Sequence, residues 1–99
     1  MTRVVAFVPD LMDRSRIAAA VPDVVFVRDA ADLVGEQADV VVLDAGRPGV
    51  LDVVPSLRCR IVAFGSHVDT ALLEAARAAG VDEVLPRSAF FRRLPEVLS

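Results

Sequence analysis

The sequence predicts an α/β fold, in which one doubly wound sheet of five parallel strands has the order 2-1-3-4-5 and carries helices on its faces. Three observations predict it. Short, mostly apolar runs alternate with helix-like segments along the whole chain. The central run, Val40-Val41-Val42-Leu43, is β-branched and ends in Asp44 and a Gly/Pro turn, as a buried parallel strand does. The 99 residues, 55% of them hydrophobic, suffice for a single domain spanning residues 1–99.

Each strand is expected where an apolar run meets a turn or capping residue. The first run ends at Pro9, the second precedes Asp29, and the third ends at Asp44. The strands are expected at residues 4–8, 24–27, 39–43, 60–64 and 83–85. Because strand and helix alternate, neighbouring strands should be parallel and joined by right-handed crossovers.

The helices are expected from their capping residues and breakers. They are expected at residues 11–20, 30–34, 49–54 and 68–79, with a last helix from residue 88. The expected N-caps are Asp10, with Asp13 as a capping-box-like partner, then Asp29, Ser66 with Asp69, and Ser88. The expected stops are Pro22, Gly35, Pro55, Gly80 and Pro95.

Composition narrows the class of protein. The formal net charge of −3 argues against a nucleic-acid-binding module, which normally has a basic face. Cys59 is the single cysteine, so neither an intrachain disulfide nor a cysteine-rich metal site is expected. No apolar run is long enough to span a membrane, and Met1-Thr2-Arg3 enters a strand pattern directly, without a signal peptide. We therefore expect a cytoplasmic protein without membrane contact.

The predicted topology gathers polar side chains at one edge of the sheet. In open α/β sheets, ligands bind beyond the carboxyl ends of the strands, near the switch between strands one and three. The residues expected there are Asp10, Asp44, Ser66, His67 and Arg87.

Motifs along nearly the whole chain resemble those of response-regulator receiver domains, which have a flavodoxin-like fold. Leu43-Asp44 followed by Pro48-Gly49 is similar to the loop of the family's phosphoacceptor aspartate. The segment from Ala76 to Leu85 resembles the exit of the family's fourth helix, and Arg14 lies where many receivers have an arginine. The resemblance implies that Asp44 is the candidate phosphoacceptor.

The same resemblance reveals departures at the active-site positions. Receivers carry adjacent acidic residues at the end of strand one to hold Mg²⁺, and here those positions are Val8 and Pro9. The strand-four hydroxyl position is Gly65, with Ser66 next to it; the strand-five lysine is replaced by Arg87, and the aromatic switch position is Val84. These changes together indicate a degenerate receiver, a pseudo-receiver, without a metal or other cofactor.

Each candidate site residue has a functional and a structural interpretation. Asp44 is either a phosphoacceptor or the cap of its own Ala45-Gly46 turn. Asp10 is either a metal ligand or a helix N-cap, and capping is favoured because it needs only the local backbone. Arg87 could contact an anion or pair with Asp44. Ser66 is expected to be a helix N-cap first and an active-site hydroxyl second. The lone His67 could be a proton shuttle or a ligand, but solvation is favoured because no other His or Cys accompanies it.

Three functions are considered from these interpretations. The first is a stand-alone pseudo-receiver, not an enzyme, that acts in signalling through a protein partner or as a homodimer. Its contact face would offer Glu74, Arg77, Asp82, Arg92 and Arg93 around Leu73 and Phe91. The alternative is an authentic single-domain receiver of a two-component phosphorelay, phosphorylated on Asp44 and dependent on Mg²⁺. A flavodoxin-like domain that binds a small molecule is a third option, without support from a phosphate-binding loop.

Overall fold

The computed structural model describes residues 2–99, which form one five-stranded parallel sheet. The order β2-β1-β3-β4-β5 confirms the predicted doubly wound topology. The strands are β1 (Val4–Phe7), β2 (Val25–Phe26), β3 (Val40–Asp44), β4 (Arg60–Gly65) and β5 (Glu83–Pro86). All five strands begin and end within one residue of the predicted ranges. β3 is central, so Asp44 lies at the middle of the carboxyl edge.

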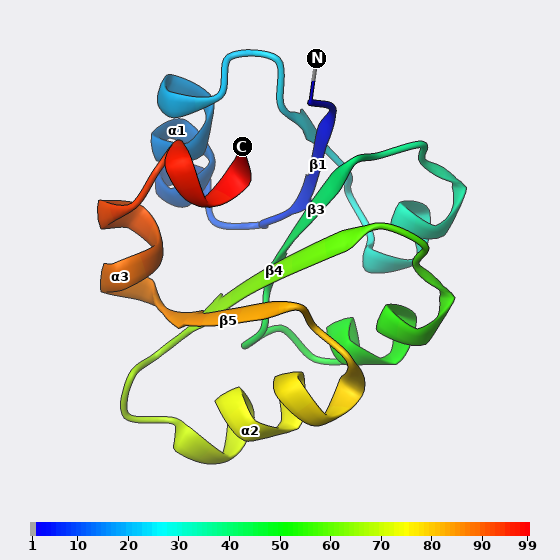
Figure 1. Ribbon diagram of the computed structural model, residues 1–99, viewed down its shortest axis with the longest axis vertical. Helices are drawn as coiled ribbons and strands as arrows, with labels where there is room; N and C mark the ends of the chain where they lie inside the picture. Colours follow the sequence, from blue (N-terminus) through cyan, green and yellow to red (C-terminus); the bar gives the residue numbers. More distant parts are fainter. Residues whose placement is uncertain (1) are drawn as a thin grey trace.

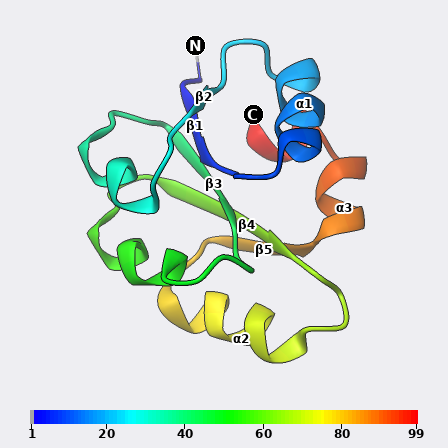
Figure 2. The ribbon, with the colours of Figure 1, turned by 180° about the vertical axis from the view of Figure 1, so that it is seen from behind.

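Alternate residues of the strands enter two separate cores, one on each face of the sheet. On one face Val41 packs with residues of η1, η2 and α2, and on the other Val42 packs with residues of α1, α3 and η3. Figures 1 and 2 show this division, with α1 and α3 on one side of the sheet and α2 on the other. The helices are α1 (Leu11–Ala20), η1 (Ala30–Gly35), η2 (Val50–Ser56), α2 (Thr70–Ala79), α3 (Arg87–Arg92) and η3 (Glu96–Leu98).

Three phenylalanines organise the core under α1 and α3. The ring of Phe64 in β4 stacks on Phe90 with a centroid distance of 4.7 Å and meets Phe91 edge-on at 5.3 Å. Phe90 and Phe91 also meet edge-on at 5.0 Å. Phe90 is completely buried and Phe91 is 8% exposed, so both rings belong to the core. Both rings point inward because α3 packs against β4.

The second and third helical segments are 3-10 helices rather than α-helices. A 3-10 helix rises about 2.0 Å per residue against about 1.5 Å in an α-helix, so a short crossover covers more of the sheet. η1 is opened by Asp29 and Asp32, whose side chains form a reciprocal capping box. Pro55 lies inside η2, which continues to Ser56, so the expectation that Pro55 ends this helix is wrong.

Two predicted N-caps, Ser66 and Ser88, are also wrong. α2 begins at Thr70 and is capped by Asp69, which accepts a hydrogen bond from the backbone N–H of Leu72 at 3.1 Å. Ser66 instead accepts from the N–H of Val68 in the preceding turn. The helix stops are better predicted, since Gly80 ends α2 at a φ of 106°, where glycine is strongly favoured.

The last helix begins one residue before the predicted cap. α3 starts at Arg87, directly after Pro86, so Ser88 lies inside its first turn. The helix ends at Arg92, before Pro95 is reached. No helix within residues 2–99 is long and apolar enough to cross a membrane.

Replacing Phe90 with alanine is expected to lower the free energy of unfolding by about 3–4 kcal/mol, because it opens a cavity beside two aromatic rings. Urea denaturation followed by circular dichroism measures this change. Val68→Ala is the matched control at a side chain that is 75% exposed, with a change within about 0.5 kcal/mol. Equal effects of the two substitutions would contradict the packing described for α3.

Candidate functional site

The carboxyl edge of the sheet is formed by the segments that follow β1, β3, β4 and β5. Val8 and Pro9 follow β1, where Val8 is completely buried and offers no metal ligand from its side chain. The carbonyl of Val8 accepts a hydrogen bond from Nε of Arg14 at 2.6 Å, and the Arg14 guanidinium lies 5.3 Å from the centre of the Phe26 ring. The guanidinium of Arg14 and the buried side chain of Val8 therefore lie at the carboxyl end of β1.

Asp44 is the last residue of β3, and its carboxylate is engaged by its own loop. Oδ1 accepts a hydrogen bond from the N–H of Gly46 at 3.0 Å, and Oδ2 accepts one from Nε of Arg47 at 3.2 Å. The Asp44 side chain is 13% exposed. The turn-capping interpretation of Asp44 is thus present in the structure, and Arg47 supplies its counter-charge.

Asp10 caps α1. Its Oδ1 accepts hydrogen bonds from the N–H groups of Met12 and Asp13 at 2.9 and 3.0 Å, which confirms the predicted N-cap. The hydrogen bond from the Asp13 N–H, helped by that from Met12 and by the charges of Arg87 and Arg47, holds the pKa of Asp10 below its ordinary value of 3.8. The carboxylate therefore stays charged at neutral pH and caps the N-terminus of α1.

Arg87 pairs with Asp13 rather than with Asp44. Its two terminal nitrogens donate to both carboxylate oxygens of Asp13, at 2.9 and 2.6 Å. Asp13 is 3% exposed, so its carboxylate is buried among packed side chains and needs this bidentate partner. The hydrogen bond with Asp13 raises the pKa of Arg87 further, although desolvation opposes the effect. The expected Arg87–Asp44 pair is therefore wrong.

The capping-box role expected of Asp13 is wrong for the same reason. The Asp13 carboxylate turns inward to Arg87 instead of back to the N–H of Asp10. The guanidinium carbon of Arg87 also lies 5.5 Å from the centre of the Phe64 ring and 5.4 Å from that of Phe91. Arg87 is thus fixed between an anion and two aromatic rings.

The predicted pocket residues separate into two groups. Asp10 lies in the loop after β1 and Asp44 ends β3, whereas Ser66, His67 and Arg87 line a hollow of about 460 Å³ beside α3. The other residues around this hollow are Arg16, Ser88, Phe91 and Arg92. The topology predicted one common edge correctly, but the edge carries an acidic side and a basic side.

The residues proposed for a contact face are mostly engaged within the chain. Arg77 pairs with Glu74 at 2.8 Å and Arg93 with Glu83 at 3.0 Å, while Asp82 accepts from the N–H of Ile61 at 2.7 Å. Leu73 and Phe91, expected as the apolar centre of this face, are 6% and 8% exposed. Arg92 remains exposed. The contact itself stays a prediction.

The carboxylates at this edge do not fit a Mg²⁺ site. Mg²⁺ prefers octahedral coordination by oxygens, with one or two carboxylates among them. Asp13 is held by Arg87, Asp44 by Arg47, and Asp10 by the first turn of α1. Within residues 2–99, no group of three His, Cys, Asp or Glu side chains could hold a metal ion together.

Sequence reasoning missed Asp13, Arg47 and Arg16 as members of the site. Arg47 lies three residues after Asp44 in a turn, a spacing that allowed the pair to be expected. Arg16, whose guanidinium lies 4.0 Å from the centre of the Phe91 ring, gave no local signal. The pairing of Asp13 joins residues 74 positions apart, which no short motif indicates.

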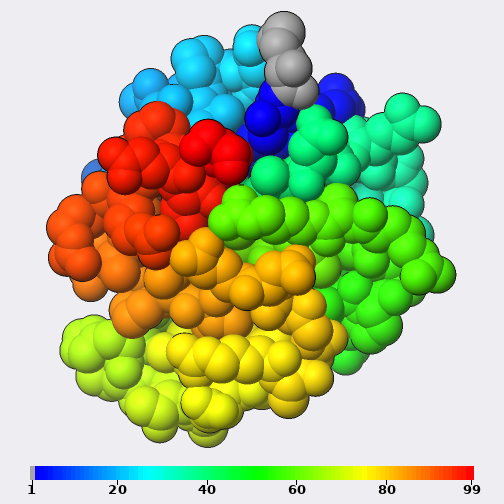
Figure 3. All heavy atoms as spheres, viewed as in Figure 1, coloured from blue at the N-terminus to red at the C-terminus, as the bar shows by residue number. Residues whose placement is uncertain are grey.

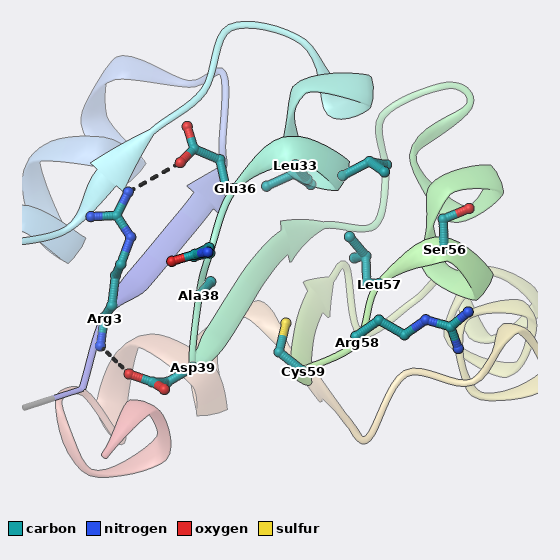
Figure 4. Close-up of a pocket in the computed structure, with 11 residues that line it drawn as sticks. Arg3, Leu33, Glu36, Ala38, Asp39, Ser56, Leu57, Arg58 and Cys59 are labelled. Carbon is teal, nitrogen blue, oxygen red and sulfur yellow. Dashed lines mark hydrogen bonds and ion pairs between the residues drawn. The ribbon is translucent and has the colours of Figure 1, made fainter.

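A second hollow lies at the opposite, amino edge of the sheet (Figure 4). Its volume is about 510 Å³, and it lies between η1 and η2. Arg3 crosses one side, donating from its guanidinium to Glu36 and from its backbone N–H to Asp39. Burial, aided by the charges of Asp82 and Asp39, raises the pKa of the Cys59 thiol, which disfavours the reactive thiolate.

Solved structures of response regulators share this fold. The chain is similar to a response regulator from Hahella chejuensis, with a TM-score of 0.84 and 20% identity over 99% of this chain and 92% of that one. For the phosphorylated cyanobacterial phytochrome response regulator RcpA, the TM-score is 0.77 and the identity 17%, over 98% of this chain and 88% of that one. For a response regulator from Thermotoga maritima, the TM-score is 0.73 and the identity 15%, over 99% of this chain and 98% of that one.

The sequence matches no protein-family model and no curated protein. At 15–20% identity, the structural likeness establishes the fold. The chain has the fold of response-regulator receiver domains, which confirms the resemblance inferred from the Asp44 loop at that level.

Replacing Arg87 with methionine is expected to lower the free energy of unfolding by about 3 kcal/mol, because it leaves the buried Asp13 carboxylate without its counter-charge. Methionine keeps the packing against Phe64 and Phe91, so the loss reports the ion pair. Urea denaturation measures it. Arg77→Met, which breaks the exposed pair with Glu74, is the matched control and costs below about 0.5 kcal/mol.

The double variant Asp13→Leu with Arg87→Met removes both charges and should recover most of the loss. An Arg87→Met variant as stable as Arg77→Met would show that the pair does not hold α1 to α3.

Proposed function

We propose that this protein is a receiver-like module that acts in signalling through contact with another protein, independently of phosphorylation at Asp44 and without catalysis of its own. The cytoplasm is the compartment that suits such a role. The observation that carries the proposal is the state of Asp44, whose two carboxylate oxygens are both engaged by its own loop.

The surroundings of Asp44 support the same proposal. Attack of a carboxylate on a phosphoryl donor brings two anions together and needs positive charge placed between them. The end of β1 offers Val8 and Pro9 instead of metal-binding acids, and Arg87 is committed to Asp13. Arg47 remains near, but its charge is already shared with Asp44.

Exposed apolar side chains beside the carboxyl edge support contact with a protein. Leu11 and Met12 in the first turn of α1 are 74% and 77% exposed, and Val68 in the turn before α2 is 75% exposed. Leu11 and Met12 are consecutive residues, and contiguous exposed apolar side chains are typical of interaction surfaces. The face with Glu74 and Arg77 offers mainly charges, so we place the primary contact at the Leu11–Met12 turn.

The alternative is an authentic phosphoacceptor with Asp44 as the nucleophile. Two observations favour it: Asp44 lies at the tip of the central strand with part of its side chain exposed, and RcpA, which shares the fold, has been solved in a phosphorylated form. In this case the salt bridge between Arg47 and Asp44 would open before the carboxylate could react.

Incubation with acetyl phosphate and Mg²⁺ is expected to leave the intact mass of the protein unchanged, because Asp44 is held by Arg47 and lacks a metal site. A beryllofluoride salt with Mg²⁺ should likewise leave the amide NMR spectrum around Asp44 unchanged. Mass spectrometry and NMR measure the two responses. A gain of one phosphoryl group that disappears in Asp44→Asn, but persists in the control Asp52→Asn, would overturn the proposal in favour of the alternative.

A photoreactive amino acid, p-benzoylphenylalanine, placed at Met12 is expected to cross-link a partner protein in cells, because this side chain is 77% exposed at the proposed contact. The same amino acid at Val34, 51% exposed at the other edge, is the matched control and should give no adduct. Gel shift and mass spectrometry identify the products, including a covalent homodimer.

The photoreactive amino acid is also placed at Arg77, and an adduct there without one at Met12 would move the contact to the charged face of α2. The absence of adducts at both positions would contradict a function in protein contact.

A further inference from the structure

The hollow beside α3 has the features of a binding site separate from Asp44. It measures about 460 Å³, within the usual range of small-molecule sites, and lies among α1, the segment before α2 and the first turns of α3. In Figure 3 the outline of the molecule is indented between the orange atoms of α3 and the yellow-green atoms of that segment. Neither Asp10 nor Asp44 lines the hollow.

The hollow concentrates positive charge in a chain whose net charge is −3. Arg16, Arg87 and Arg92 line it, and no aspartate or glutamate does. The ion pair with Asp13 neutralises the charge of Arg87. Within residues 2–99, Arg16 and Arg92 make no ion pair, so two guanidinium charges remain uncompensated. An anion bound between them would relieve their repulsion.

Two of the arginines have contacts within the protein that position their guanidiniums before any ligand binds. The guanidinium of Arg16 lies 4.0 Å from the centre of the Phe91 ring, and Arg87 is fixed by Asp13 and by two rings. This order reduces the conformational entropy that a ligand would have to remove. The phenylalanines are buried, so the positions of both arginines follow from the core.

The donor set suits a phosphate group better than a single carboxylate. Besides the guanidiniums, the lining supplies the hydroxyls of Ser66 and Ser88 and the imidazole of His67. The Ser66 oxygen accepts from the N–H of Val68, which leaves its own O–H free to donate. Donors arranged on several sides match the three outward oxygens of a phosphate monoester, and its charge of roughly −2 matches two free guanidiniums.

We propose that this hollow binds an organic phosphate monoester, carried either by a small molecule or by a phosphorylated side chain of another protein. Arg16, Arg92 and the two serines contact the phosphate, and the remaining volume holds the organic group. The site is a single hollow rather than an extended basic stripe, so it fits one phosphate group and not a nucleic-acid backbone.

Titration of the full chain with phosphoserine, followed by amide NMR shifts and calorimetry, tests the site. Phosphoserine should shift the amides of Ser66, His67 and Ser88, and serine should not. Arg16→Gln and Arg92→Gln should each weaken binding about tenfold, the loss of one charge-assisted interaction. Arg28→Gln is the matched control, because it removes the same charge from an exposed arginine outside the hollow.

Ser88→Ala gives a second readout that leaves every charge in place, and it should also weaken binding while circular dichroism shows an unchanged fold. Phenyl phosphate and a phosphoserine peptide, compared with its unphosphorylated form, distinguish the two sources of the phosphate. No shift with any of these probes, equal weakening by Arg28→Gln and Arg16→Gln, or tighter binding of a single-stranded DNA oligomer than of phosphoserine would overturn the proposal.

Discussion

The buried ion pair between Arg87 and Asp13 is the interaction on which the rest of this structure depends. It joins the first turn of α1 to the junction of β5 and α3, two segments 74 positions apart. A carboxylate that is 3% exposed is tolerable only with such a partner, because an unpaired buried charge would strongly favour unfolding. The pair also fixes the Arg87 guanidinium over Phe64 and Phe91, so it links the charged edge of the sheet to its aromatic core.

This pair determines what remains at the carboxyl edge. Arg87 is turned toward Asp13, and Asp44 takes its hydrogen bonds from Gly46 and Arg47 within its own loop. Both aspartates thus have internal partners, and the positive charge that a phosphoryl group would need is divided between them. A receiver fold is preserved, while the groups at the site stabilise one resting arrangement.

Carboxylates and unpaired arginines lie at different places along this edge. Asp10 and Asp44 lie with the loops after β1 and β3, whereas Arg16 and Arg92 border the hollow beside α3. Asp13 neutralises the charge of Arg87 through their ion pair. Arg16 and Arg92 have no carboxylate partners among residues 2–99. Charge separation of this kind gives a small acidic protein one local site for anions.

The sequence by itself determined the features that depend on neighbouring residues. Apolar runs placed the strands, and the N-cap of Asp10, the stop at Gly80 and the turn at Asp44 followed from local backbone hydrogen bonding. Only the tertiary structure decided which anion Arg87 would meet and that Phe91 would be buried. Both outcomes depend on how α1 and α3 pack across the sheet. Periodicity and capping describe residues a few positions apart, so they carry no information about a pair that forms only when distant segments meet.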